Sequence, residues 1–254
     1  MRKATFLEYD KPLLCAVVQD RSPQEMIVTI NNSLYDGAEA FCIQLEILKP
    51  EYRNEQTLKE IFSACRGLPI YITSYRKYFS EHLTDDDCAE LLLLGAKCGA
   101  TLCDVPGDFY CPEPHELTED IAAIAKQKKL IERIHALGCE VLMSSHLHGF
   151  YDEKEVNRIA LAQRERGADV VKIVNFATTE EEFLQNVQIC TRLKRVLNCP
   201  YLYLASGEYG RFIRQTGGKL GCCMYLGVER YHTGSFVEQP ILRSLKVIRD
   251  NMVF

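Results

Sequence analysis

Short apolar runs alternate along the chain with longer stretches in which apolar residues recur at helical spacing. Apolar runs that are continuous rather than alternating are typical of parallel strands covered on both faces. The runs predict eight strands, over residues 13–18, 40–45, 70–74, 100–104, 140–145, 170–175, 201–205 and 222–226. The stretches between them predict helices, since several open with Ser-Pro or an acidic turn and close near a glycine.

A strand followed by a helix, repeated about eight times, closes most naturally into a (β/α)8 TIM barrel with a parallel sheet, in the α/β class. The alternative is an open doubly wound sheet, which usually carries a glycine-rich loop after an early strand. Here the first predicted strand is followed by "QDRSPQE", which contains no glycine. No linker or low-complexity stretch divides the chain, so we expect a single domain over residues 1–254.

Composition narrows the classes of function. The chain has 254 residues and a formal charge of -5, which argues against a protein that binds phosphate backbones, and none of its apolar runs is long enough to span a bilayer. The N-terminal stretch lacks the apolar core and cleavage site of a signal peptide, so a cytoplasmic location is the default expectation. The 12 cysteines are scattered and mostly lie in apolar settings, which predicts reduced, buried thiols.

In a barrel of this kind, functional side chains gather at the C-terminal ends of the strands. Those ends carry the polar residues that become candidates for a site: Cys42, Gln44, Thr73, Ser74, Arg76, Asp104, His146, His148, Lys172 and Asn175, with segments 205–214 and 230–236 after the last two strands. We therefore expect a small-molecule site at this face.

Lys172 is unusual because it interrupts the apolar run Val170, Val171, Ile173 and Val174. If its side chain points into the barrel, desolvation lowers its pKa well below the ordinary value of about 10.4. A neutral amine can attack a ketone or aldehyde and form an imine, which then acts as an electron sink. The alternative is a side chain that points outward between helices with its ammonium in solvent.

His146 ends the strand expected beside that of Lys172, so both side chains can face one cavity. Imine chemistry needs an acid–base group near neutral pH, which histidine provides. A buried structural histidine is the plainer alternative. His146 and His148 could also bind a metal from one face of a strand, but only the isolated Asp104 and His232 are available as further ligands, so no metal is expected.

Arg214 lies in "GEYGRFIRQTGGKLG", which predicts a short helix that closes with Gly217 and Gly218. A guanidinium there could hold a substrate carboxylate through paired hydrogen bonds. A cation on the surface of a helix is the alternative.

Together these stretches resemble the type I 3-dehydroquinate dehydratases, the Schiff-base family of the shikimate pathway. "GADVVKIV" resembles the strand with that family's imine-forming lysine, "VLMSSH" the strand that ends in its catalytic histidine, and "SGEYGRFIRQTGGKLG" the stretch with its carboxylate-binding arginine. "GAEAFCIQLEIL" and "LPIYITSYR" resemble its second and third strands. The resemblance implies Lys172, His146 and Arg214 in these roles, with no cofactor.

The chain departs from the family on its second strand, where the family has E-x-R-x-D. Cys42 and Gln44 stand in place of the glutamate and arginine that contact ring hydroxyls, and Glu46 keeps the acidic third position. After the third strand the register is shifted by one residue. The resemblance there implies Arg76 as the family's arginine and Glu81 as the glutamate that pairs with the histidine.

Two further departures concern the fourth and eighth strands. The family's D-x-E becomes "DVP", so Asp104 remains and the glutamate is lost. The family's S-A-x-G-Q loop becomes "HTGSF", which places His232 and Phe236 where serine and glutamine would stand. A substrate hydroxyl left unpaired in such a site costs about 1–3 kcal/mol, and sites built for a hydroxyl discriminate strongly.

We therefore expect a lyase that eliminates water from a keto-carboxylate, either 3-dehydroquinate or, in preference, a related compound. Retro-aldol cleavage is a close variant. The alternative is a ligand-binding or regulatory barrel that no longer catalyses a reaction. The expected partner is a small molecule rather than nucleic acid or membrane, and pairing into a homodimer through exposed helices is left open.

Overall fold

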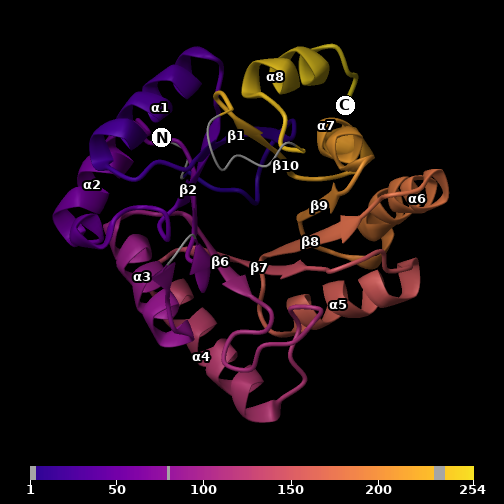
Figure 1. Cartoon of the computed structure of the whole chain (residues 1–254), viewed down its shortest axis with the longest axis horizontal. Helices are drawn as coiled ribbons and strands as arrows, with labels where there is room; N and C mark the ends of the chain where they lie inside the picture. Colours follow the sequence, from indigo (N-terminus) through magenta and orange to yellow (C-terminus); the bar gives the residue numbers. More distant parts are fainter. Residues whose placement is uncertain (1–3, 79–80, 232–237) are drawn as a thin grey trace.

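The structure is a computed structural model that describes residues 4–78, 81–231 and 238–254, without the side chains of residues 77, 78 and 81. Eight parallel strands form a nearly closed barrel, which confirms the predicted (β/α)8 fold (Figure 1). The strands are β1 Leu13–Val18, β2 Ala40–Gln44, β3 Ile70–Thr73, β6 Leu102–Pro106, β7 Glu140–His146, β8 Val170–Phe176, β9 Tyr201–Ser206 and β10 Met224–Val228. They follow the order β10-β1-β2-β3-β6-β7-β8-β9.

Helices surround the barrel and alternate with its strands (Figure 1). They are α1 Pro23–Tyr35, α2 Glu55–Ala64, α3 Asp85–Cys98, α4 Ile121–Ala136, α5 Glu153–Glu165, α6 Glu180–Val196, α7 Gly210–Leu220 and α8 Leu242–Asp250, with a short 3-10 helix at Pro50–Tyr52. In the part of the chain that is described, none of the helices combines the length and apolarity needed to cross a bilayer.

The predicted helix signals act as expected at their ends. Ser22 caps α1 in front of Pro23, and Thr84 forms a reciprocal capping box with Asp87 at the start of α3. Helix α3 ends at Gly99 in the left-handed region, with φ 113°. Local sequence therefore fixes where these helices begin and end.

The predicted end of α7 is wrong, because the helix continues past Gly217 and Gly218 to Leu220. A Cβ atom at Gly218 would collide with the ring of Tyr225 on β10. These glycines therefore do not break the helix; Gly218 lets α7 lie close against the barrel.

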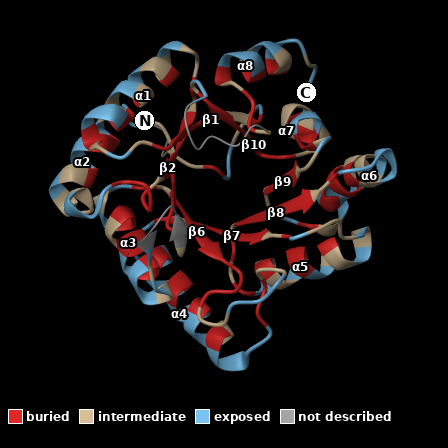
Figure 2. Ribbon diagram, in the orientation of Figure 1, coloured by how far each residue is buried: buried red, intermediate tan, exposed pale blue. Residues whose placement is uncertain are grey.

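Figure 2 shows that the barrel strands are buried along most of their length, while each helix exposes its outer face. Phe6 packs against the N-terminal end of the barrel, where it is fully buried and its ring is edge-on to that of Tyr71, with 6.4 Å between centroids. The backbone NH of Phe6 donates to Glu140 at the start of β7, at 3.0 Å. Phe6 therefore covers part of the N-terminal end of the barrel, opposite the C-terminal strand ends that carry the candidate site residues.

One small element was not expected from the sequence. Lys77–Tyr78 (β4) and Glu81–His82 (β5) pair as an antiparallel hairpin between β3 and α3. The predicted strands at 100–104 and 222–226 also begin two residues later than expected, at Leu102 and Met224. Apolar residues that lead into a strand carry no signal for where its pairing begins.

Candidate active site

Lys172 lies inside the barrel, and only 5% of its surface is exposed. Its strand β8 pairs in parallel with β7, where Lys172 is level with Ser144, and with β9, where it is level with Leu202. The side chain extends into the interior, and Nζ reaches residues of β3 and β6, which lie beyond the neighbouring strand β7. The outward orientation considered above does not occur.

Three acceptors surround the ammonium of Lys172. Nζ donates to the hydroxyl of Tyr71 at 3.1 Å, to the hydroxyl of Tyr75 at 2.9 Å and to Oδ2 of Asp104 at 3.0 Å. Both tyrosine hydroxyls in turn donate to the same oxygen of Asp104, Tyr75 at 2.7 Å. The result is a closed network of one cation, one anion and two phenols.

Asp104 is fully buried, so its charge depends on this network. Burial alone would raise the pKa of its carboxyl, but the charge of Lys172 and the bonds from the tyrosine hydroxyls hold that pKa below its ordinary value. Burial and the neighbouring Asp104 raise the pKa values of Tyr71 and Tyr75 well above the ordinary value, so both phenols stay protonated. Lys172 and Asp104 therefore form a charged pair.

Sequence reasoning missed both tyrosines. Tyr71, Thr73 and Tyr75 follow one another at a spacing of two, which in a strand puts side chains on one face. That alternation was a usable signal. It was hidden because Ile70 and Ile72 make the strand read as a continuous apolar run.

His146 stands at the C-terminal end of β7 and is half-buried. Its Nδ1 lies 2.7 Å from Oε2 of Glu116, and its backbone NH donates to the same oxygen at 2.9 Å. Burial opposes the charge of Glu116, but the contacts with His146 lower the pKa of this carboxyl overall. The carboxylate therefore orients the imidazole through Nδ1, and Nε2 is the ring nitrogen that remains for proton transfer.

Glu116 comes from the loop between β6 and α4, at a residue with a positive φ of 44°. Nothing in the local pattern marks it, because the residues of an irregular loop follow no periodicity. The partner implied for the histidine was Glu81, whose side chain lies outside the described residues. His148 is exposed beyond the end of β7, and the described residues contain no cluster of three potential metal ligands.

The predicted residues of the second strand lie near the network. Cys42 is buried, and burial raises the pKa of its thiol, so the thiol stays protonated. The amide of Gln44 accepts a hydrogen bond from Gln19 Nε2 at 2.7 Å. Glu46 is buried and accepts from the hydroxyl of Thr73 at both carboxyl oxygens, at 3.0 and 2.9 Å; burial raises the pKa of Glu46 to about 7.

Arg76 is engaged by acidic residues outside this network. Its guanidinium pairs with Asp85 at the start of α3 and donates to Asp108 at 2.8 Å, on the side chain, and at 2.7 Å, on the backbone carbonyl. Although Arg76 follows Tyr75 directly in the sequence, its charge is balanced by Asp85 and Asp108 rather than by Asp104. The hydroxyl of Tyr75, rather than Arg76, meets Lys172.

Arg214 lies on α7, and its Nε donates to the carbonyl of Ala205 at 3.0 Å. Burial lowers the pKa of Arg214 to about 10, against the charge of Glu238, so the group remains cationic at neutral pH. The side chain is thus fixed at the C-terminal end of β9. His232 and Phe236, the remaining predicted contacts, lie outside the described residues.

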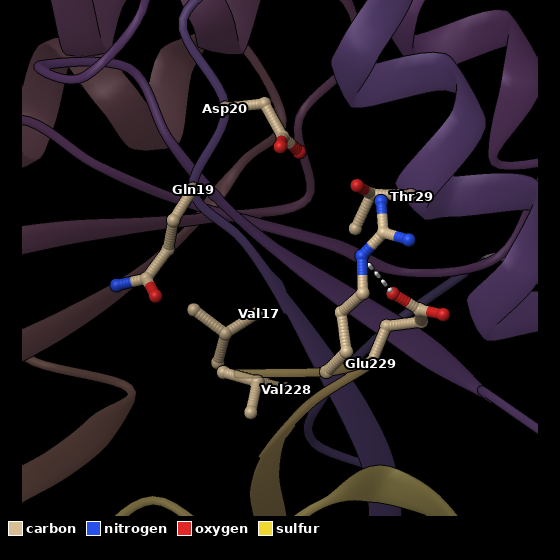
Figure 3. Close-up of a pocket in the computed structure, with 7 residues that line it drawn as sticks. Val17, Gln19, Asp20, Thr29, Val228 and Glu229 are labelled. Carbon is tan, nitrogen blue, oxygen red and sulfur yellow. Dashed lines mark ion pairs between the residues drawn. The ribbon is translucent and has the colours of Figure 1, made fainter. Parts of the chain in front are cut away.

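A small cavity opens at the C-terminal ends of β1 and β10, lined by Val17, Gln19, Asp20, Thr29, Val228, Glu229 and Arg230 (Figure 3). Glu229 forms an ion pair with Arg230, and Figure 3 shows Glu229 on the side of the cavity opposite Gln19. The volume is about 70 Å³. Ligand pockets usually measure about 300–1,000 Å³, so this space suits water molecules rather than a keto-carboxylate.

The arrangement joins a potential nucleophile to an acid–base pair. Lys172 supplies an amine, and His146 with Glu116 supplies an imidazole whose second nitrogen can take and return a proton. Tyr75 lies between the two groups, since its ring meets that of His146 edge-on at 5.5 Å between centroids.

Comparisons with known proteins agree with this barrel. The model of the type I 3-dehydroquinase family matches residues 14–239. The 3-dehydroquinate dehydratase of Geobacillus kaustophilus HTA426 has a similar structure, with a TM-score of 0.81 and 14% identity over 96% of this chain and 92% of that one. No curated protein is significantly similar in sequence.

Two further solved structures are similar. A type I 3-dehydroquinate dehydratase from Clostridium difficile, described with covalently modified comenic acid, gives a TM-score of 0.79 and 16% identity over 96% of this chain and 93% of that one. The 3-dehydroquinate dehydratase of Enterococcus faecalis gives a TM-score of 0.76 and 13% identity, over 97% of this chain and 96% of that one. At such identities the structural likeness concerns the fold.

Proposed function

Because the chain belongs to the type I 3-dehydroquinase family, we propose that it is a Schiff-base-forming lyase that eliminates water from a keto-carboxylate. The observation that carries the proposal is a lysine amine buried in the barrel, on the strand next to one that ends in a histidine–glutamate pair. A buried lysine is otherwise rare, and catalytic amines are a common reason for one. Family membership makes this reaction class the first one to test.

In the proposed reaction, the Lys172 amine attacks the ketone carbon, and the carbonyl oxygen leaves as water when the iminium forms. Nε2 of His146 then removes a proton from the carbon next to the iminium carbon, whose electrons the iminium accepts. The hydroxyl on the following carbon departs with that proton as a second water. Hydrolysis of the conjugated iminium releases the product and restores Lys172.

Glu116 acts in this scheme through His146. A carboxylate on Nδ1 keeps the proton-transferring nitrogen on the opposite side of the ring and stabilises the imidazolium that forms. Arg214, fixed by Ala205, would bind the substrate carboxylate with its terminal guanidinium nitrogens. Gln44, Cys42 and Asp104 would form further substrate contacts, as would His232 and Phe236.

The substrate we favour is a relative of 3-dehydroquinate rather than 3-dehydroquinate itself. Cys42 and Gln44 replace the charged pair that resemblance to the family assigns to ring hydroxyls, and Arg76 is already held by Asp85 and Asp108. A hydroxyl that loses a charged partner in a buried site loses about 1–3 kcal/mol of binding. A substrate with fewer hydroxyls would suit this site.

Borohydride trapping tests the proposal. The protein is incubated with 3-dehydroquinate and with other cyclic keto acids in the presence of borohydride, and the adduct is located by peptide mass spectrometry. We expect one stable adduct, at Lys172, and none in the Lys172→Ala variant. Full turnover by Lys172→Ala would contradict the proposal. Keto acids that bind equally well to Lys172→Ala and are never turned over would indicate the ligand-binding alternative instead.

A further inference from the structure

The amine of Lys172 cannot react in the state that the structure describes. All three of its N–H donors are engaged, by Tyr71, Tyr75 and Asp104. An ammonium has no lone pair, so it must lose a proton before it attacks a carbonyl, and one of its three partners must give up its place to the substrate. The inference below rests on the proposed function and concerns how this happens.

Of the three partners, Tyr75 is the one placed to move. Asp104 and Tyr71 are fully buried, and Tyr71 is fixed in the sheet, where it pairs with Cys42 of β2 and Leu102 of β6. Tyr75 is half-buried and lies beyond Thr73, the last residue of β3. Its side chain therefore starts beyond the C-terminal end of β3, and its hydroxyl meets the amine from there.

Tyr75 also touches both of the groups that the reaction needs. Its hydroxyl lies 2.9 Å from Nζ of Lys172, and its ring meets the ring of His146 edge-on, at 5.5 Å between centroids and 87° between planes. Nδ1 of His146 faces Glu116, so the nitrogen left for a new proton is Nε2.

We infer that Tyr75 is a catalytic residue that relays a proton from Lys172 to His146 and, by turning toward His146, uncovers the amine for the substrate. The hydroxyl of Tyr75, which donates to Asp104 in the structure, first turns its O–H toward Nε2 of His146. Its oxygen then takes a proton from Nζ while the hydroxyl proton passes to Nε2. Lys172 becomes neutral, His146 becomes an imidazolium beside the Glu116 carboxylate, and the phenol of Tyr75 is unchanged.

The proton held by His146 is used in the next step. Attack by the neutral amine gives a carbinolamine, and its hydroxyl leaves as water when the imidazolium returns the proton. The iminium is then in place, and His146 is neutral again and ready to remove the proton from the adjacent carbon. The cycle needs no external acid or base.

The other titratable groups around Lys172 fit this role less well. Asp104 is held in its ionised form and receives three hydrogen bonds. Glu46 binds Thr73 through both oxygens, and the thiol of Cys42 is deeply buried. Glu116 is occupied by His146.

The test compares Tyr75→Phe with Tyr71→Phe. Each variant removes one hydroxyl that binds both Lys172 and Asp104, and each keeps the ring, so the two differ in position alone. The measured quantity is the rate at which the borohydride-trapped adduct forms at Lys172, between pH 6 and 10. We expect Tyr75→Phe to slow it at neutral pH by on the order of 10²-fold, as is typical for a positioned acid–base group. Tyr71→Phe should slow it much less.

The defect of Tyr75→Phe should shrink as the pH rises, because hydroxide in solution can then remove the ammonium proton. Equal slowing in both variants, or an unchanged rate in Tyr75→Phe, would overturn the relay. An absence of any adduct in the wild-type protein would instead refute the proposed function. If a variant fails to fold, the solvent isotope effect on adduct formation by the wild-type protein tests the relay. Transfer of two protons in one step makes the trapping rate depend on the fraction of D₂O along a curve. A linear dependence rejects the relay.

Discussion

A single oxygen, Oδ2 of Asp104, accepts hydrogen bonds from Lys172, Tyr71 and Tyr75. Removing one member of a buried ion pair usually costs about 3–5 kcal/mol, because the partner charge is left uncompensated. The carboxylate therefore holds the amine in place as well as balancing its charge. Its position on the fourth barrel strand was visible in the sequence, whereas its contacts with Lys172, Tyr71 and Tyr75 were not.

Glu46 gives a prediction at the residue scale. Burial raises the pKa of its carboxyl to about 7, so the folded protein binds a proton more tightly than the unfolded chain does. The contribution of Glu46 to the free energy of unfolding is therefore fully present below the unfolded pKa of about 4.5 and is lost as the pH rises through about 7. We expect Glu46→Gln, whose amide oxygen can still accept from Thr73, to remove that part of the decline.

The measurement is urea unfolding of both proteins at pH 5 and pH 8. The free-energy difference between the two pH values should be smaller in Glu46→Gln than in the wild type. The same difference in both proteins would show that Glu46 titrates alike in the folded and unfolded states.

At the scale of elements, helix α7 shows how a local signal can mislead. Two adjacent glycines usually weaken a helix by about 0.5–1 kcal/mol each relative to alanine. In α7 they lie within the helix, and Gly218 faces Tyr225 of β10 at a distance that admits no Cβ. Packing therefore outweighs helix propensity at this position, and the close contact holds Arg214 at the rim of the barrel.

Gly218→Ala should consequently destabilise the protein, by about 1–3 kcal/mol as is usual for overpacking. Gly217→Ala is the matched control, because a Cβ there would lie 3.3 Å from Sγ of Cys222 and needs only a small adjustment. Thermal unfolding should show a lower midpoint for Gly218→Ala than for Gly217→Ala. Equal midpoints would mean that Tyr225 moves aside without penalty.

For the whole molecule, closure of the barrel joins the first and last elements of the chain. Arg249 at the end of α8 is buried and donates to the carbonyl of Pro12, just before β1, at 3.1 Å. It also pairs with Glu39, just before β2, with one bond at 2.8 Å. Glu39 in turn accepts from the backbone NH of Leu14 at 3.2 Å.

Arg249→Ala should lower the free energy of unfolding by about 1–3 kcal/mol, because the buried carbonyl of Pro12 and the partly exposed carboxylate of Glu39 lose their donor. Arg243→Ala on the same helix is the control, since Arg243 is 71% exposed and lies 3.5 Å from Asp36, and surface pairs contribute about 0–1 kcal/mol. Denaturant titration measures both. A loss as small in Arg249→Ala as in Arg243→Ala would mean that the contact with Pro12 and Glu39 does not help to hold the barrel closed.

The sequence by itself determined the barrel, because the eight buried runs and the helical stretches between them are local patterns. Each can be recognised from the spacing of its apolar residues and from the residues that cap its helices. It also marked Lys172 and His146, since a charged or ionisable group at the end of an apolar run stands out without knowledge of its neighbours. Only the tertiary structure decided that Tyr71, Tyr75 and Asp104 surround the amine and that Glu116 meets His146. These partners are 30 to 101 residues away from the groups they bind, and contacts at such separations depend on how the strands close into a ring rather than on any local pattern.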